Sequence, residues 1–114
     1  MCLFDSLVLC KFMHTSGAIK VRPMLNFFNY VTSFNMSIEE FMKTGERIFN
    51  LQRLYNTKCG ISKKDDILHL RFLNLKRDRD ELPSIGLLSD YYELRGWSED
   101  GLPMDEKLEE LDIK

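Results

Sequence analysis

A carboxylic acid and a thiol lie five residues apart near the start of the chain, at Asp5 and Cys10 of an otherwise apolar segment. The acid can accept hydrogen bonds or cap a helix, and the thiol can ligate a metal or pack as a small apolar side chain. On a straight α-helix, five residues correspond to about 500° of rotation, so the two side chains would point about 140° apart. They could serve one site only if the chain turns between them, or if each faces a different partner.

The other cysteines and the histidines show no ligand pattern. Cys2 and Cys59 have no metal-ligand spacing with Cys10, and His14 and His69 are 55 residues apart. Three cysteines at irregular spacing fit a reducing cytoplasm better than a disulfide framework. We therefore expect incidental thiols at Cys2 and Cys59, histidines that are exposed or satisfied by local partners, and a cytoplasmic location.

Two further features are interpreted as structural. Asp65 and Asp66 are adjacent, so their side chains diverge, and a turn or cap role is favoured over paired acid–base chemistry. Trp97 directly follows Gly96, a residue typical of a helix C-terminus, and is expected to be a packing anchor.

Composition limits the class of protein. The chain has 114 residues, of which 44% are apolar, as in an ordinary single globular domain. No run of about 18 apolar residues is present, so no membrane span is expected, and Asp5 and Lys11 interrupt what could otherwise resemble a secretory signal. Residues 79–114 carry four basic side chains against eleven acidic ones, which argues against general nucleic-acid binding.

The apolar spacing predicts helices along most of the chain. Residues 3–13 have a helical pattern that Thr15–Gly17 breaks, and residues 23–34 are apolar on more than one side, which predicts a heavily buried helix. Ser37 and Glu40 form a capping box at the start of a long helix that should stop before Gly60.

Glycine in the interior of that long helix costs roughly 1 kcal/mol relative to alanine. Gly45 therefore suggests the close approach of another backbone. Ser62 is placed to cap a short turn over residues 63–66, and two more helices are expected at about 85–95 and 104–111. No β-alternation is sustained, so the prediction is a single all-α domain, residues 1–114, with five or six helices.

Four segments, in order along nearly the whole chain, together resemble the C-terminal helical domain of the tungsten-containing aldehyde:ferredoxin oxidoreductases. They are Asp5-Ser6-Leu7-Val8-Leu9-Cys10, which is similar to the family's Asp-x-x-Gly-Leu-Cys motif, the helix 45–56, Lys63-Lys64-Asp65-Asp66 with Arg71-Phe72, and 91–97 followed by Gly101, Pro103 and 106–108.

The resemblance implies roles for three residues. Cys10 would be the fourth ligand of a [4Fe–4S] cluster, Asp5 an acceptor for the amines of a tungsten-bis-pterin, and Leu9 a nearby main-chain contact. In the family the other three cluster cysteines belong to an upstream Cys-x-x-Cys-x-x-x-Cys run, which this sequence lacks. One thiolate cannot hold a cluster that requires four, so the isolated chain is expected to bind neither cofactor and to oxidise no aldehyde.

The sequence departs from the family pattern at two positions where we expect the local structure to differ. Val8 stands where the family often has glycine, and a β-branched residue does not easily adopt positive φ, which disfavours a tight backbone approach there. Met104 stands where a threonine would cap the last helix, so that helix should fray more.

Two functions follow. The first is a C-terminal helical fragment or subunit of a tungstopterin oxidoreductase, completed by missing N-terminal domains and linked to ferredoxin only through them. The alternative is a free-standing interaction protein that has lost the redox role and dimerises through the face around Leu7 and Phe12. Phe4, Leu7, Leu9 and Phe12 would form that apolar surface.

The residue roles differ between these cases. In the isolated chain we expect Cys10 to be a buried core cysteine, and it is a ligand only in a completed enzyme. For Asp5 the sequence supports an N-cap on the first helix as well as it supports a pterin contact.

Overall fold

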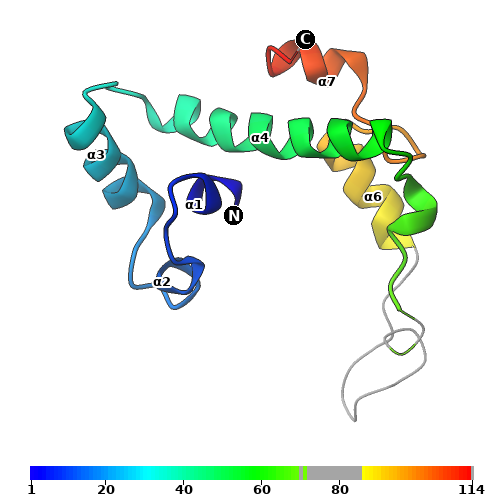
Figure 1. Ribbon diagram of the computed structural model, residues 1–114, viewed down its shortest axis with the longest axis horizontal. Helices are drawn as coiled ribbons and strands as arrows, with labels where there is room; N and C mark the ends of the chain where they lie inside the picture. The colour runs from blue at the N-terminus through cyan, green and yellow to red at the C-terminus, as the bar shows by residue number, and fades with distance from the viewer. Residues whose placement is uncertain (70, 72–85, 114) are drawn as a thin grey trace. The chain divides into compact units, whose positions relative to one another are not determined.

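The computed structural model describes residues 1–69, 71 and 86–113. In these residues the structure is helical, with α1 (Cys2–Ser6), α2 (Lys11–Thr15), α3 (Val21–Thr32), α4 (Ile38–Lys58), a 3₁₀ turn η1 (Lys63–Asp65), α6 (Gly86–Arg95) and α7 (Asp105–Glu110) (Figure 1). The prediction of an all-α fold with five or six helices is confirmed by the six α-helices of the described residues, where the only β-type pairing is an isolated bridge between Trp97 and Pro103.

The chain forms two compact units, Met1–Leu51 and Gln52–Lys114. The expected single domain over residues 1–114 stays a prediction. No helix in the described part of the chain is long and apolar enough to cross a membrane. The expected apolar anchors at 70, 72 and 73 and the charge run 76–81 lie outside the described residues.

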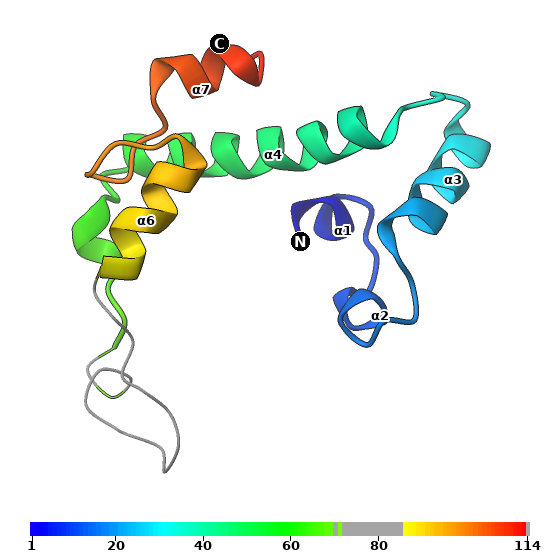
Figure 2. The same cartoon turned by 180° about the vertical axis from the view of Figure 1, so that it is seen from behind.

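The first unit packs three helices around a small core. Phe4 of α1, Met24 and Leu25 of α3 and Phe41 of α4 are each 5% exposed or less and pack together. Figures 1 and 2 show α1 beside the first half of α4, and a Cβ added at Gly45 would lie 2.8 Å from Leu3 Cγ. Gly45 therefore makes room for a side chain, and the expected approach of another backbone is wrong.

The start of α4 follows the sequence prediction. The Ser37 amide donates to a Glu40 carboxylate oxygen at 2.8 Å, and the Glu40 amide donates to Ser37 Oγ at 3.1 Å. The hydrogen bond from the Ser37 backbone, followed by a smaller contribution from the Ser37 side chain, holds the pKa of the Glu40 carboxyl below its ordinary value. The capping box is confirmed.

Four helices end in the same way, with a left-handed residue and a pair of crossed backbone hydrogen bonds that define a Schellman motif. The left-handed position holds glycine after α4 and α6, at Gly60 and Gly96, as the sequence predicted. It holds Val8 after α1 and Asp112 after α7. The last helix begins at Asp105 with Met104 in the cap position and no side-chain cap, and its expected fraying stays a prediction.

The expected continuous helix over residues 3–13 is instead two short helices, α1 and α2. Val8 has φ 55°, its amide donates to the Asp5 carbonyl at 3.2 Å, and the Leu9 amide donates to the Phe4 carbonyl at 2.8 Å. The expectation that valine would prevent a glycine-like backbone is thus wrong. The Val8 side chain is 91% exposed, so the conformation meets no packing conflict beyond its own backbone strain.

Candidate functional site

The turn between α1 and α2 carries all three residues that the resemblance assigns to cofactors. Asp5 lies in α1, Leu9 follows the turn, and Cys10 is the N-cap residue of α2. Asp5 and Cys10 are exposed, and Leu9 is 38% exposed. The chain therefore does turn between the acid and the thiol, which was the condition for the two to serve one site.

Two structural interpretations of these residues are wrong. The N-cap of α1 is Met1, so Asp5 does not cap the first helix. Cys10 is exposed, so it is not a buried core cysteine. Among the described residues, no side chain bonds to the Asp5 carboxylate or the Cys10 thiol, because their segment ends a five-residue helix and faces solvent.

The apolar surface expected beside this turn is only partly present. Phe4 is 4% exposed and belongs to the core, with its ring centroid 5.0 Å from that of His14. Leu7 is half-buried against the same core. Leu9 and Phe12 remain exposed, at 38% and 70%, so the exposed surface is smaller than predicted.

The remaining metal-type side chains have the local roles that the sequence predicted. His14 Nδ1 lies 3.0 Å from the Ile19 carbonyl oxygen, and the Arg71 amide donates to His69 Nδ1 at 3.1 Å. No disulfide joins the three cysteines. Within residues 1–69, 71 and 86–113, no three His, Cys, Asp or Glu side chains are grouped as a metal site would require.

The second unit contains a buried polar cluster that the sequence analysis missed. Arg53 of α4 forms a two-bond ion pair with Asp66, with Nη1 2.9 Å from Oδ1 and Nη2 2.5 Å from Oδ2. Tyr92 Oη of α6 donates to Asp66 Oδ2 at 2.5 Å, and Arg53 Nε donates to the Gly101 carbonyl at 2.7 Å. The Arg53 guanidinium also lies over the Trp97 ring, 5.0 Å from its centroid.

The charges of this cluster are set by its contacts. The hydrogen bond from Arg53 lowers the pKa of Asp66, which remains ionised, and burial, followed by the bond to Asp66, raises the pKa of Tyr92 to about 12. A side chain at Gly101, where φ is 77°, would collide with the Arg53 guanidinium. The cluster therefore holds α4, α6 and two loops of the second unit together.

A signal for this cluster was present in the sequence. Arg53 follows Gly45 and Phe49 at four-residue spacing, on the apolar side of the long helix, where an arginine needs a buried acidic partner. Asp65 has the predicted cap role in a box with Ser62, which leaves Asp66 as the acid available to Arg53. Trp97 is 5% exposed after the end of α6, and so is the packing anchor that was predicted.

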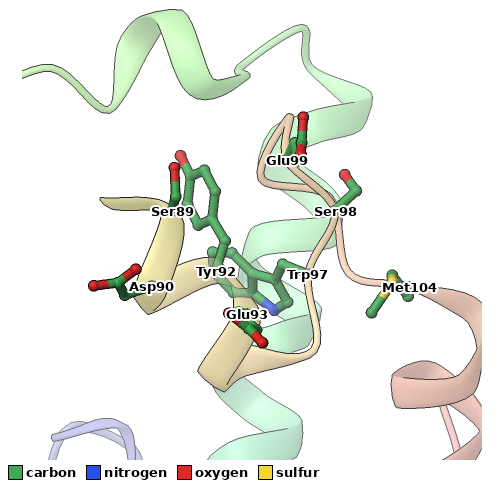
Figure 3. Close-up of a pocket in the computed structure, with 8 residues that line it drawn as sticks. All are labelled: Ser89, Asp90, Tyr92, Glu93, Trp97, Ser98, Glu99 and Met104. Carbon is green, nitrogen blue, oxygen red and sulfur yellow. The ribbon is translucent and has the colours of Figure 1, made fainter. Parts of the chain in front are cut away.

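A pocket of about 370 Å³ lies in the second unit. Figure 3 shows the Tyr92 and Trp97 rings next to each other, with the carboxylates of the pocket around them; the lining residues are Ser89, Asp90, Tyr92, Glu93, Trp97, Ser98, Glu99 and Met104. None of Asp5, Leu9 or Cys10 lines it. The residues expected to do chemistry are therefore on the exposed turn between α1 and α2 rather than in this pocket.

Comparison with known proteins gives one consistent family. The model of "Aldehyde ferredoxin oxidoreductase, domains 2 & 3" matches residues 1–113. The tungsten-containing aldehyde ferredoxin oxidoreductases of Pyrococcus furiosus and Thermococcus kodakarensis are 39% and 41% identical to the chain, in each case over 97% of its length. A Pyrococcus furiosus protein described as an aliphatic sulfonate oxidoreductase, WOR-like subunit, is 30% identical over 96% of the chain.

The relatives are much longer than this chain, which spans 19% of the length of each of these three proteins. The match to the family model nevertheless covers nearly every residue, including the turn between α1 and α2 and all the elements of the buried cluster. The chain belongs to the aldehyde ferredoxin oxidoreductase family, in which it matches domains 2 and 3.

Proposed function

We propose that this chain is the helical part of a tungsten-containing aldehyde ferredoxin oxidoreductase and contributes one [4Fe–4S] ligand and the pterin contacts to a complete cytoplasmic enzyme. The observation that carries the proposal is the turn after α1, where Asp5 and Cys10 are exposed on a chain that matches the family over residues 1–113. The tungsten-containing relatives support the cofactor assignment.

The residues of this chain could supply one ligand of an iron–sulfur cluster, with the other ligands coming from the rest of the enzyme. The exposed Cys10 thiol can deprotonate and bind iron, whereas a cluster needs four such ligands. The described residues supply no group of three metal-binding side chains, so the other ligands belong to the rest of the enzyme. Asp5 presents an exposed carboxylate that can accept N–H bonds from a flat heterocycle, and Leu9, also exposed, would supply main-chain contact.

In the complete enzyme the cofactors would supply oxidation of an aldehyde to a carboxylate and transfer of the electrons to ferredoxin. This chain's own contribution is positional. The Schellman turn fixes the backbone between Asp5 and Cys10, so the acceptor and the thiol are held on either side of one rigid corner. The alternative of a free-standing homodimer is not favoured, since the family match spans the whole chain.

The test uses a chimera in which residues 1–114 replace the matching segment of the Pyrococcus furiosus aldehyde ferredoxin oxidoreductase. Iron and tungsten are measured per chain for the parent chimera, for Cys10→Ser and for Cys59→Ser, whose exposed thiol lies at the end of α4 and serves as the matched control. We expect Cys10→Ser to lose most of the cluster iron and Cys59→Ser to retain it. Unchanged iron in Cys10→Ser, with a normally loaded parent, would refute the ligand assignment.

A further inference from the structure

Helix α3 carries a second apolar face that nothing in the described structure covers. Phe27, Tyr30 and Val31 are 69%, 87% and 68% exposed, and Phe34, just beyond the helix, is 70% exposed. We call these four residues the α3 face. The sequence predicted that α3 would be heavily buried, and for this face the prediction is wrong.

The α3 face is separate from the side of the helix that packs on the core. Met24 and Leu25 are each 5% exposed and fill the first unit's core. Phe27, Tyr30 and Val31 are three and four residues apart, which places them together on a neighbouring side of the helix. The helix therefore has enough apolar surface for two partners and has only one.

The α3 face is much larger than a single exposed apolar side chain, which would need no explanation. An aromatic side chain buries about 150–250 Å² when covered, so three aromatics and a valine offer on the order of 500 Å². A standard protein interface buries about 800 Å² per partner. The α3 face could thus form the apolar centre of an interface, and when uncovered it is large enough to promote self-association.

We propose that the α3 face docks into an apolar groove on the remaining domains of the oxidoreductase. This inference rests on the proposed function and names where the partner binds. The relatives contain about five times as much chain as this sequence, which provides the partner surface. Phe27, Tyr30 and Val31 occupy positions i, i+3 and i+4, which are usual anchors of a helix in a groove, and Phe34 follows the left-handed residue Ser33 that ends the helix.

Charge adds a detail to the partner and disfavours a membrane. Residues Val21–Thr32 contain no acidic side chain, and Lys20 and Arg22 flank the start of the helix. The groove should therefore be acidic where it meets Lys20, whereas Arg22, five residues before Phe27 on the helix, points about 140° away from it. Two basic residues fall short of the four to eight, approximately, that are typical of a segment binding anionic lipid.

The test compares the accessibility of a thiol on the α3 face in two settings. Tyr30→Cys is labelled with N-ethylmaleimide in the 114-residue chain and in the chimera with the Pyrococcus furiosus relative, and peptide mass spectrometry separates this site from Cys2, Cys10 and Cys59. Glu39→Cys, an exposed position in the first turn of α4, is the control. We expect at least a tenfold slower reaction of Tyr30→Cys in the chimera and little change for Glu39→Cys.

Several outcomes would overturn the inference. Equal labelling of Tyr30→Cys in both settings means that the oxidoreductase domains do not cover the face. Protection already present in the free chain means that its own residues or, with a dimer in sedimentation, a second copy cover it. Protection of the free chain by phosphatidylcholine–phosphatidylserine vesicles means that the face binds lipid. If the chimera fails to fold, the same labelling is done on the chain co-expressed with the rest of the relative.

The inference and the proposed function fail separately. Iron lost in Cys10→Ser with Tyr30→Cys still reactive refutes only the docking surface. Iron unchanged in Cys10→Ser with Tyr30→Cys protected refutes only the ligand assignment.

Discussion

Individual residues decide whether the turn that carries Asp5 and Cys10 forms. Val8 occupies the left-handed position of a Schellman motif that glycine fills in two other helices of the chain, after α4 and α6. The conformation costs an ordinary residue about 1–2 kcal/mol, and Val8 recovers nothing from packing because its side chain is 91% exposed. The two backbone hydrogen bonds of the motif and the burial of Phe4 hold it in place.

Val8→Gly should therefore stabilise the chain. Relief of the left-handed strain exceeds the added backbone entropy of glycine, which costs about 0.5–1 kcal/mol, so the net gain should be about 0.5–1 kcal/mol. Urea unfolding measures it, with Asp112→Gly as the control at the other of the four Schellman positions that lacks glycine. Aspartate tolerates this conformation better, so the control gain should be smaller. A lower free energy of unfolding for Val8→Gly would contradict the assignment of strain to residue 8.

Tyr92 sets the stability of the second unit through one hydroxyl. Tyr92→Phe removes the bond to the ionised Asp66 and should cost about 1.5–3 kcal/mol at pH 7, measured by urea unfolding. Tyr91→Phe, on the neighbouring exposed tyrosine, is the control and should change little. Equal losses in the two variants would show that the Asp66 bond is not the cause.

The same hydroxyl predicts the alkaline behaviour. The folded pKa of Tyr92, about 12, lies above its ordinary value of about 10, so its contribution is complete below pH 10 and is lost as pH rises toward 12. The gap in stability between the wild type and Tyr92→Phe should narrow over that range. Asp66, whose pKa is lowered, contributes above its ordinary pKa of about 4 and loses its contribution as pH falls further. A gap that stays constant from pH 9 to pH 12 would contradict the coupling.

For the helices, caps and stops that depend on neighbouring residues could be predicted from the sequence, whereas contacts between residues far apart in the chain could not. The box at Ser37 and Glu40 and the stops at Gly60 and Gly96 depend on residues within one turn, so the sequence reveals them. The break after α1 lacks a glycine to mark it, so the two short helices were predicted as one. The buried cluster joins Asp66 to Arg53, which is 13 positions away, and to Tyr92, which is 26 positions away. The spacing of apolar residues does not reveal contacts over such separations.

The exposed face of α3 shows a second limit of periodicity. Apolar side chains all round a helix indicate how much surface could be buried, and they do not indicate which partner buries it. Met24 and Leu25 are buried in the core of the first unit, whereas Phe27 and Tyr30 are exposed. The sequence predicted the candidate site residues only through the family resemblance, and their exposure required the structure.

The contact between Leu3 of α1 and Gly45 of α4 can be tested by substitution. Gly45→Ala improves helix propensity by about 1 kcal/mol but places a methyl 2.8 Å from Leu3 Cγ, and overpacking costs about 1–3 kcal/mol. We expect a net loss of about 1 kcal/mol in urea unfolding. In a Leu3→Ala background the obstacle is gone, so the same substitution should become stabilising. A change of equal sign and size in both backgrounds would contradict the contact.

The family model matches nearly every residue of this chain, and yet the chain spans only about a fifth of the length of its relatives. Under the proposed function that difference in length governs the chemistry, since one thiolate can complete a four-thiolate cluster site and cannot create one. The fold is stabilised by the small core of the first unit and by the buried Arg53–Asp66–Tyr92 cluster of the second, while the exposed turn after α1 and the α3 face remain available to other protein surfaces.

The most direct measurement is iron per chain after anaerobic treatment with iron and sulfide, made on the 114-residue chain alone and on its chimera with the Pyrococcus furiosus relative. We expect essentially no cluster iron in the chain alone and about four irons in the chimera, which Cys10→Ser should lose. A brown monomer of the 114-residue chain that holds about four irons would contradict this expectation.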